Sequence, residues 1–290
     1  MKYQVTRVKR LQLIGFLFTL PGLIAYLCWT LYPIFYAFVI SFEKWSLNPR
    51  MPNTFVGFSN YAKAFGDSVA IHAFINTFLY ALITVPGQMF FGLLIALALN
   101  KKIFAQTTFR LLYYFPVITS WVVVSFIFSY LFAGYGGLIN YILHTNIHWL
   151  STPSTAMIPI YILGIWKGIG WSMLIFLAGL QGIPIQLYEA AKLDGANRWN
   201  LFRYITLPMI KPIFMFELVM LTIGGFNVFL SVWLMTSGGP MNSTQVVSVY
   251  MFQQAFQYFD FGYGAALSVL LFIIIFTIAQ VQRKWLKSTY

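Results

Sequence analysis

The chain has 290 residues, of which 60% are apolar and only 8% are charged, and its formal net charge is +12. Soluble domains carry roughly 25% charged residues, so this composition excludes an ordinary soluble domain and indicates an integral membrane protein. The single cysteine, Cys28, excludes an intrachain disulfide.

Long runs without Lys, Arg, Asp or Glu divide the chain. They cover Leu11–Phe42, Ser68–Asn100 and Leu111–Trp166. A helix crosses the hydrocarbon core with about 20 apolar residues, so each run holds one or two crossings. Breaks at turn-forming and polar clusters predict an all-α bundle of six membrane helices in one domain, residues 1–290, with helices near Leu11–Ser41, Ile71–Leu99, Phe109–Phe132, Ala156–Leu180, Ile210–Met235 and Tyr263–Gln282.

The first of these helices follows a basic N-terminal segment, residues 1–10. A basic start before an apolar run also opens a secretory signal, but signal cores hold only roughly 7–15 apolar residues. The run from Leu11 to Phe42 is much longer and lacks a cleavage pattern after a short core. A retained first membrane helix is therefore expected.

Basic residues are distributed unequally between the two sides of the predicted topology. Only Lys44, Arg50 and Lys63 fall on one side. Since basic loops stay in the cytoplasm, this distribution predicts that residues 1–10, the fourth loop and the C-terminus are cytoplasmic. The charges are scattered over several loops, which argues against nucleic-acid binding. The cytoplasmic set comprises Lys2, Arg7, Lys9, Arg10, Lys101, Lys102, Arg110, Lys192, Arg198, Arg203, Lys211, Arg283, Lys284 and Lys287.

Motifs for catalysis or metal binding are missing from the sequence. There is no G-x-x-x-x-G-K-[ST], H-E-x-x-H or G-x-S-x-G segment. The histidines His72, His144 and His148 lack the further donors that a tetrahedral metal site needs. We therefore expect neither a catalytic residue nor a metal site.

The fourth predicted helix carries Gly164, Lys167, Gly168 and Trp171 on one face, because these residues are spaced i, i+3, i+4 and i+7. The fifth repeats this spacing with small and apolar residues. Its glycines either allow close helix packing or leave room for a solute, and the sequence leaves both interpretations open. The fifth-helix positions are Leu221, Gly224, Gly225 and Val228, with Asn227 nearby.

Lys167 needs its own explanation. A charge near the middle of a span costs about 2.5–3.5 kcal/mol on insertion scales and is usually functional or paired. Lys167 either faces a transport pathway, which we favour, or pairs with Glu217 on the fifth helix.

Between these helices lies a polar loop, residues 186–209. Glu189, Ala190 and Ala191 suit a short helix, and Asp194-Gly195 is a turn signal. A second short helix follows, before the fifth membrane helix begins. The loop is predicted to form a helix–turn–helix that either lies on the lipid surface or binds a protein.

This loop resembles a known signature. YEAAKLDGANRWNLFRYITLPMIKP (188–212) looks like the loop by which permease subunits of binding-protein-dependent ABC importers dock into their ATPase. Two further segments resemble the carbohydrate-uptake branch of that family, in the subunit similar to the larger maltose-type permease. They are FVGFSNYAKAF (55–65) and MTSGGPMNSTQVVSVYMFQQAFQYFDFGYGAALSV (235–269).

The resemblance implies a type I permease bundle in a bacterial or archaeal cytoplasmic membrane. Its partners would be a second homologous permease, two copies of a cytoplasmic ATPase and an extracytoplasmic solute-binding protein. ATP and Mg would bind the ATPase, and this chain would bind no cofactor. The residues implied in ATPase coupling are Glu189, Ala190, Ala191, Asp194, Gly195, Ala196, Leu207 and Pro208.

The resemblance also implies a cargo. The positions on the fourth and fifth helices correspond to sugar contacts in a maltose-type permease, so a di- or oligosaccharide is expected. Importers of glycerol-phosphate esters or acidic oligosaccharides are the alternative. A secondary transporter is a further one, although such proteins usually show intramembrane ionisable groups and internal repeats.

Overall fold

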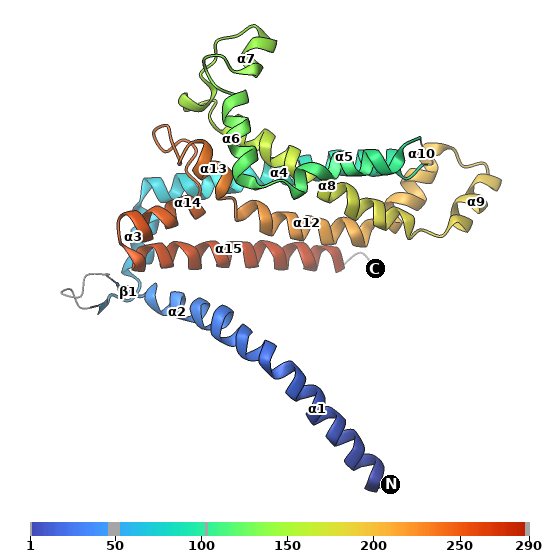
Figure 1. Ribbon diagram of the computed structural model, residues 1–290, viewed down its shortest axis with the longest axis horizontal. Helices are drawn as coiled ribbons and strands as arrows, with labels where there is room; N and C mark the ends of the chain where they lie inside the picture. Colours follow the sequence, from blue (N-terminus) through green and yellow to red (C-terminus); the bar gives the residue numbers. More distant parts are fainter. Residues whose placement is uncertain (1, 46–52, 102–103, 288–290) are drawn as a thin grey trace. The chain divides into compact units, whose positions relative to one another are not determined.

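The computed structural model describes residues 2–45, 53–101 and 104–287 (Figure 1), and side chains within residues 11–284 of these ranges. Arg50 and Lys102, which entered the topology prediction, lie outside the described residues. The chain forms two compact units. The first combines the chain up to Ala64 with Gln253–Val269, and the second combines Phe65–Phe252 with the chain from Leu270.

The first unit is mostly helical, with one short antiparallel pair in which Glu43 lies opposite Phe55. Helix α15 begins in this unit and continues into the second. The elements are α1 (Lys2–Tyr26), the π-helical turn η1 (Leu27–Leu31), α2 (Tyr32–Ile40), β1 (Glu43–Lys44), β2 (Thr54–Phe55), α3 (Ser59–Gly66), η4 (Gln253–Gln257) and α15 (Phe261–Lys287).

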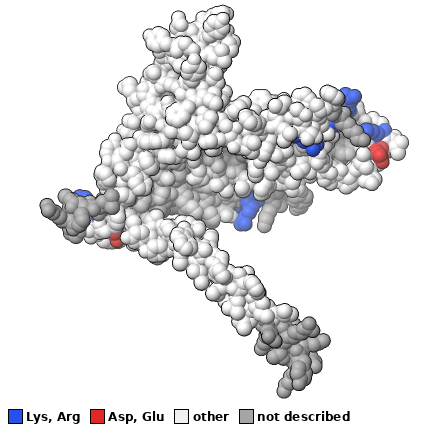
Figure 2. Space-filling model, in the orientation of Figure 1, with Lys and Arg blue, Asp and Glu red and all other residues white. Residues whose placement is uncertain are grey.

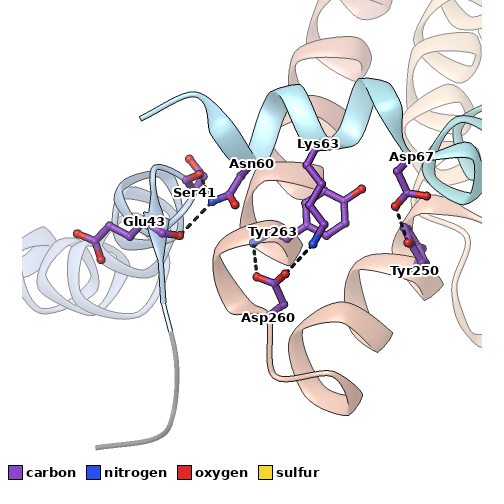
Figure 3. A network of polar contacts seen from close by, with 8 residues as sticks. All are labelled: Ser41, Glu43, Asn60, Lys63, Asp67, Tyr250, Asp260 and Tyr263. Atoms are coloured by element: carbon purple, nitrogen blue, oxygen red, sulfur yellow. Dashed lines mark hydrogen bonds and ion pairs between the residues drawn. The ribbon is translucent and has the colours of Figure 1, made fainter. Parts of the chain in front are cut away.

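Polar side chains on α3 hold the first unit together (Figure 3). Asn60 Nδ2 donates to the main-chain oxygens of Ser41 at 2.9 Å and Glu43 at 3.0 Å. Lys63 Nζ lies 2.8 Å from Asp260 Oδ2 and 3.9 Å from the centroid of the Tyr263 ring. These contacts join α3 both to the end of α2 and to the start of α15.

The second unit contains the remaining helices, and its longest members are α4, α8 and α12. In Figure 1, α9 and α10 lie at one end of this bundle, whereas α13 and α14 lie at the other. The elements are α4 (Ser68–Leu99), α5 (Gln106–Ile118), α6 (Trp121–Leu131), α7 (Leu138–Leu143), η2 (Trp149–Ser151), α8 (Met157–Gln181), α9 (Ile185–Leu193), α10 (Arg198–Leu201), η3 (Phe202–Thr206), α11 (Leu207–Met209), α12 (Lys211–Phe226), α13 (Leu230–Met235) and α14 (Val247–Phe252).

Helix α8 lies at the centre of the second unit, and glycines allow its neighbours to come close. A Cβ on Gly92 of α4 would lie 2.4 Å from the Ser172 Cβ, and one on Gly170 would lie 2.1 Å from the Tyr113 oxygen on α5. Small residues at helix contacts permit this approach in membrane proteins. The unit also contains a buried apolar core, made of Tyr80, Val124, Phe128, Phe132, Met157, Ile160, Leu163, Val228, Val232, Met235, Val246 and Val249.

The N-terminal end of α4 is fixed by Asp67. Its Oδ1 accepts from the main-chain nitrogen of Val69 at 2.9 Å, as an N-cap side chain does, and its Oδ2 accepts from the Tyr250 hydroxyl at 2.6 Å (Figure 3). One carboxylate thus starts α4 and joins it to α14.

Within the described ranges, five helical segments are long and apolar enough to cross a membrane, and a bent pair brings the number to six. Their positions agree with the predicted spans, so the prediction of an all-α membrane bundle is confirmed. The five are Leu11–Ile40, Ser68–Leu99, Met157–Gln181, Lys211–Met235 and Phe261–Lys284.

The third predicted span is different, because the prediction of one continuous helix over Phe109–Phe132 is wrong. Helices α5 and α6 meet at 94°, and Thr119 between them is extended, with φ −72° and ψ 142°. The Thr119 hydroxyl donates to the Phe115 oxygen at 2.9 Å. Ser120 Oγ caps α6 by accepting from the Val122 nitrogen at 3.3 Å. Side chains that bond to nearby main-chain groups compete with a continuous helix in this way.

Candidate functional site

A cavity of about 490 Å³ lies within the second unit. Residues from α4, α5, α6, α8, α12 and α13 line it. Every residue predicted for the pathway lies on its wall, namely Gly164, Lys167, Gly168, Trp171, Leu221, Gly224, Gly225, Asn227 and Val228. The structure therefore brings the predicted positions of both helices together around one space. The expected helical face of the fifth span is interrupted, however, because α12 ends at Phe226 and Val228 lies in the non-helical link before α13.

The cavity wall combines aromatic rings with a few polar groups. Trp121, Trp171 and Phe229 contribute rings. Gln88 Nε2 donates to the Gly164 oxygen at 3.1 Å and Asn227 Nδ2 donates to the Ile223 oxygen at 2.8 Å, which leaves each side-chain amide oxygen as an acceptor. A largely apolar wall with a few fixed polar groups is typical of a site for a small organic ligand.

Lys167 is part of this wall, but its ammonium group is directed at main-chain oxygens. The side chain is only 5% exposed, and Nζ lies 2.8 Å from the Pro116 oxygen, 3.4 Å from that of Val117 and 2.6 Å from that of Thr119. Glu217, its alternative partner, instead accepts from the Ser172 hydroxyl at 2.7 Å. Lys167 is thus bonded to the end of α5.

The glycines of the two faces have different surroundings. A Cβ on Gly164 would lie 2.3 Å from the Tyr80 hydroxyl oxygen, and one on Gly168 would lie 2.2 Å from the Gln88 side chain. A Cβ on Gly225 would lie 3.2 Å from Ala81. No described atom outside its own helical turn lies within 4 Å of the corresponding point on Gly224. Close packing therefore explains the first three glycines, whereas Gly224 faces open space.

The polar loop forms two helices joined by a tight turn, as its sequence predicts. Glu189, Ala190 and Ala191 lie in α9, and Asp194 is its C-cap. Gly195 has φ +82°, and a helix commonly ends with a glycine in this left-handed conformation. The Gly195 nitrogen donates to the Lys192 oxygen at 3.0 Å and the Ala196 nitrogen to the Ala191 oxygen at 2.9 Å, which is the bond pattern of a Schellman motif.

The second arm of this loop packs back on the first. Asn197 begins α10 by accepting from the Asn200 nitrogen at 2.9 Å, and the hydroxyl oxygens of Tyr188 and Thr206 lie 2.9 Å apart. Leu207 and Pro208 are in α11, directly before α12. The two halves of the loop therefore contact each other, and the loop is joined to α8 at its start and to α12 at its end.

The surface of this loop combines exposed apolar and charged side chains. Leu193 is 90% exposed and Trp199 is 62% exposed. Charged side chains surround them, and Figure 2 shows basic and acidic atoms at the end of the bundle that carries α9 and α10. The exposed charged residues are Glu189, Lys192, Asp194, Arg198 and Arg203.

Comparison with known proteins decides the family. A family model described as "Binding-protein-dependent transport system inner membrane component" matches residues 88–288. The chain belongs to this family. The permease is 32% identical to "Probable ABC transporter permease protein YurN" of Bacillus subtilis, over 97% of this chain and 98% of YurN. It is 34% identical to "Arabinooligosaccharides transport system permease protein AraP" of the same species, over 93% of this chain and 87% of AraP.

A solved structure shows the same fold. The permease superposes on a chain of a bacterial ABC transporter involved in the import of the acidic polysaccharide alginate with a TM-score of 0.83, over 99% of both chains and at 21% identity. The predicted type I ABC importer permease fold is therefore confirmed. The chain is the membrane-spanning subunit of an ABC importer, and it is a transport subunit rather than an ATPase.

Several cavity residues of the permease were not predicted. They come from α4, from the bend between α5 and α6, and from α13, and they comprise Tyr80, Gln88, Val117, Trp121, Phe229, Leu230 and Ser231. Gln88 carried a usable signal, because an amide in the middle of a long apolar run has few roles other than a buried hydrogen bond or a ligand contact. Val117 and Trp121, at the bend, carried no such signal, because they are apolar residues within an apolar run.

Proposed function

We propose that the permease forms one half of an ATP-driven pathway that imports a di- or oligosaccharide into the cytoplasm. The observation that carries the proposal is the single cavity on which all the residues of the two predicted helix faces lie. Its aromatic rings suit the apolar C–H faces of a sugar ring, and the amides of Gln88 and Asn227 suit hydroxyl groups. The name of AraP, a relative over nearly the whole chain, supports the same class of cargo.

The coupling segment, residues 186–209, is proposed to dock into a cytoplasmic ATPase. Exposed Leu193 and Trp199 with charged neighbours form the mixed apolar and charged surface that a protein partner covers. Glu189, Ala190 and Ala191 would enter the ATPase, and the turn at Asp194, Gly195 and Ala196 would fix the angle of the second arm. Leu207 and Pro208 would transmit its movement to α12.

The complete transporter would contain this permease, a second homologous permease, two ATPase copies that hold ATP and Mg, and an extracytoplasmic solute-binding protein. Both termini and the coupling segment would face the cytoplasm. ATP-driven closure of the ATPases would move the coupling segment, and α8 and α12 would carry this movement to the cavity as rigid helices. Packed helix interfaces switch between discrete arrangements, so a small movement can change which side of the membrane the cavity faces.

The test uses the complete complex reconstituted in liposomes with ATP inside and the binding protein outside. A panel of neutral di- and oligosaccharides, an acidic oligosaccharide and a glycerol-phosphate ester is offered as radiolabelled cargo. We expect ATP-dependent uptake of a neutral saccharide and stimulation of ATP hydrolysis by the loaded binding protein. Uptake that persists without ATP but stops with an ionophore would identify a secondary transporter, and uptake confined to the anionic compounds would support the alternative cargo.

A further inference from the structure

We propose that Lys167 is a positioning residue that holds the bend between α5 and α6 in the cavity wall, and that it does not bind the cargo. The proposal rests on the proposed function only in treating the cavity as the cargo site. Its structural part concerns the bend alone and can be tested in the absence of any sugar.

The bend creates a local need for hydrogen-bond donors. Where a helix ends, its last carbonyl groups lose their main-chain N–H partners, and the end of the helix carries a partial negative charge. Helix α5 ends at Ile118, and the chain turns through 94° before α6 begins at Trp121. At membrane depth, non-helical main chain is tolerated only where it is buried in protein or lines a water-filled cavity, so these groups need partners from one of the two.

Lys167 supplies these donors from the neighbouring helix α8. An ammonium group has three N–H donors, and Nζ has three main-chain acceptors, the oxygens of Pro116, Val117 and Thr119. Nζ also lies 4.9 Å from the centroid of the Trp121 ring, within the range of a cation–π contact. The positive charge is therefore balanced by the end of α5, and its N–H groups are directed at protein rather than at the cavity.

The residues on both sides of this contact lie on the cavity wall. Val117 lies in the last turn of α5 and Trp121 is the first residue of α6, and both line the same space as Lys167. If the ammonium group is removed, the carbonyl groups lose their donors, and the bend can relax. Lys167 would therefore affect the cargo indirectly, through the placement of Val117 and Trp121.

The decisive experiment measures cysteine labelling at the bend in the assembled complex without cargo. Cys28→Ser removes the chain's single cysteine, and Val117→Cys then provides a reporter for a small neutral maleimide. We expect Lys167→Met, which keeps a flexible unbranched side chain one atom shorter but has no donor, to raise the labelling rate by roughly tenfold, the factor that corresponds to losing about one charged hydrogen bond. Lys167→Arg, which restores donors, should return the rate close to that of the parent.

A second reporter controls for general loosening of the membrane domain. Gly224→Cys lies on a different helix of the cavity wall, α12, with no described atom outside its own helical turn within 4 Å of its Cβ position, and its labelling rate should not respond to Lys167→Met. Equal increases at both reporters, or no increase at Val117→Cys, would overturn the proposal. Should the Met variant fail to assemble, Lys167→Gln keeps a donor amide and should label at an intermediate rate; a rate equal to that of the parent would also overturn it. Neither result bears on whether the transporter carries sugars.

Discussion

Ser172 on α8 donates its hydroxyl proton to Glu217 on α12, with 2.7 Å between Oγ and Oε1. Both side chains are 0% exposed, and the second carboxyl oxygen, Oε2, has no hydrogen-bond partner among the described residues. The contact joins the two helices that continue from the ends of the coupling segment. It therefore lies where a movement of that segment would reach the membrane domain.

The first prediction concerns this contact. Ser172→Ala should lower the stability of the purified complex by about 1–3 kcal/mol, because it leaves a buried carboxyl group without its donor. Glu217→Gln should change stability little, since the amide keeps an acceptor and removes a charge that is costly inside a membrane. Thermal unfolding in detergent measures both. Ser129→Ala is the control, since its hydroxyl donates to the Ser125 oxygen on its own helix; losses of equal size at Ser172 and Ser129 would contradict the prediction.

The second prediction separates packing glycines from the glycine that faces open space. Gly170→Ala places a methyl group against the Tyr113 main-chain oxygen, 2.1 Å away, and overpacking of this kind typically costs about 1–3 kcal/mol. Gly224→Ala meets no described atom outside its own helical turn within 4 Å, so the complex should assemble normally. Its added methyl group narrows the cavity and should raise the cargo concentration for half-maximal uptake. Normal assembly of both variants with unchanged uptake would show that neither glycine acts as argued.

Most of the fold was predictable because the spans are continuous apolar runs with turn residues between them. The bend in the third span was not predictable for a physical reason. Pro116, Thr119 and Ser120 are all tolerated within membrane helices, so their presence does not require a break. The donor that satisfies the bend, Lys167, is on a different helix, and a contact between distant parts of the chain has no local signature.

The residues of the candidate site also fall into those with a local sequence signal and those without one. The turn at Gly195 was predictable because its cause is local: a glycine that follows a short helix can adopt the left-handed conformation that ends it. The faces of α8 and α12 followed from helical spacing and from the resemblance of the surrounding sequence. Tyr80 was missed because no sequence pattern on α4 marks the side chains that face the cavity, and its packing against Gly164 of α8 selects that face. Gln88 could have been found, because it is an amide within a long apolar run.

The third prediction compares two polar contacts of α3 in the first unit. Asn60→Ala should lower stability by about 1–3 kcal/mol, since the oxygens of Ser41 and Glu43 both lose a largely buried donor. Lys63→Met should cost about 0–1 kcal/mol, because its ion pair with Asp260 is partly exposed, at 49% and 34%. Thermal unfolding of the two variants at low and high salt distinguishes the hydrogen bonds of Asn60 from the ion pair of Lys63. Only the difference between parent and Lys63→Met should shrink in high salt; a salt-dependent loss in Asn60→Ala would contradict this assignment.

The fourth prediction tests the turn of the coupling segment. Gly195→Ala forces a residue with a Cβ into φ +82°, at a cost of about 1–2 kcal/mol, although no described atom lies within 4 Å to clash with the new methyl group. The variant should therefore insert and assemble, but the second arm should be displaced relative to α9. We expect ATP hydrolysis stimulated by the loaded binding protein to fall severalfold while basal hydrolysis is kept, because the ATPase would still be present but would be poorly linked to α12. Gly182→Ala is the matched control: this glycine precedes the same segment and has φ −78°, a conformation that alanine adopts freely. Equal stimulation in the two variants would show that the left-handed turn does not matter for coupling.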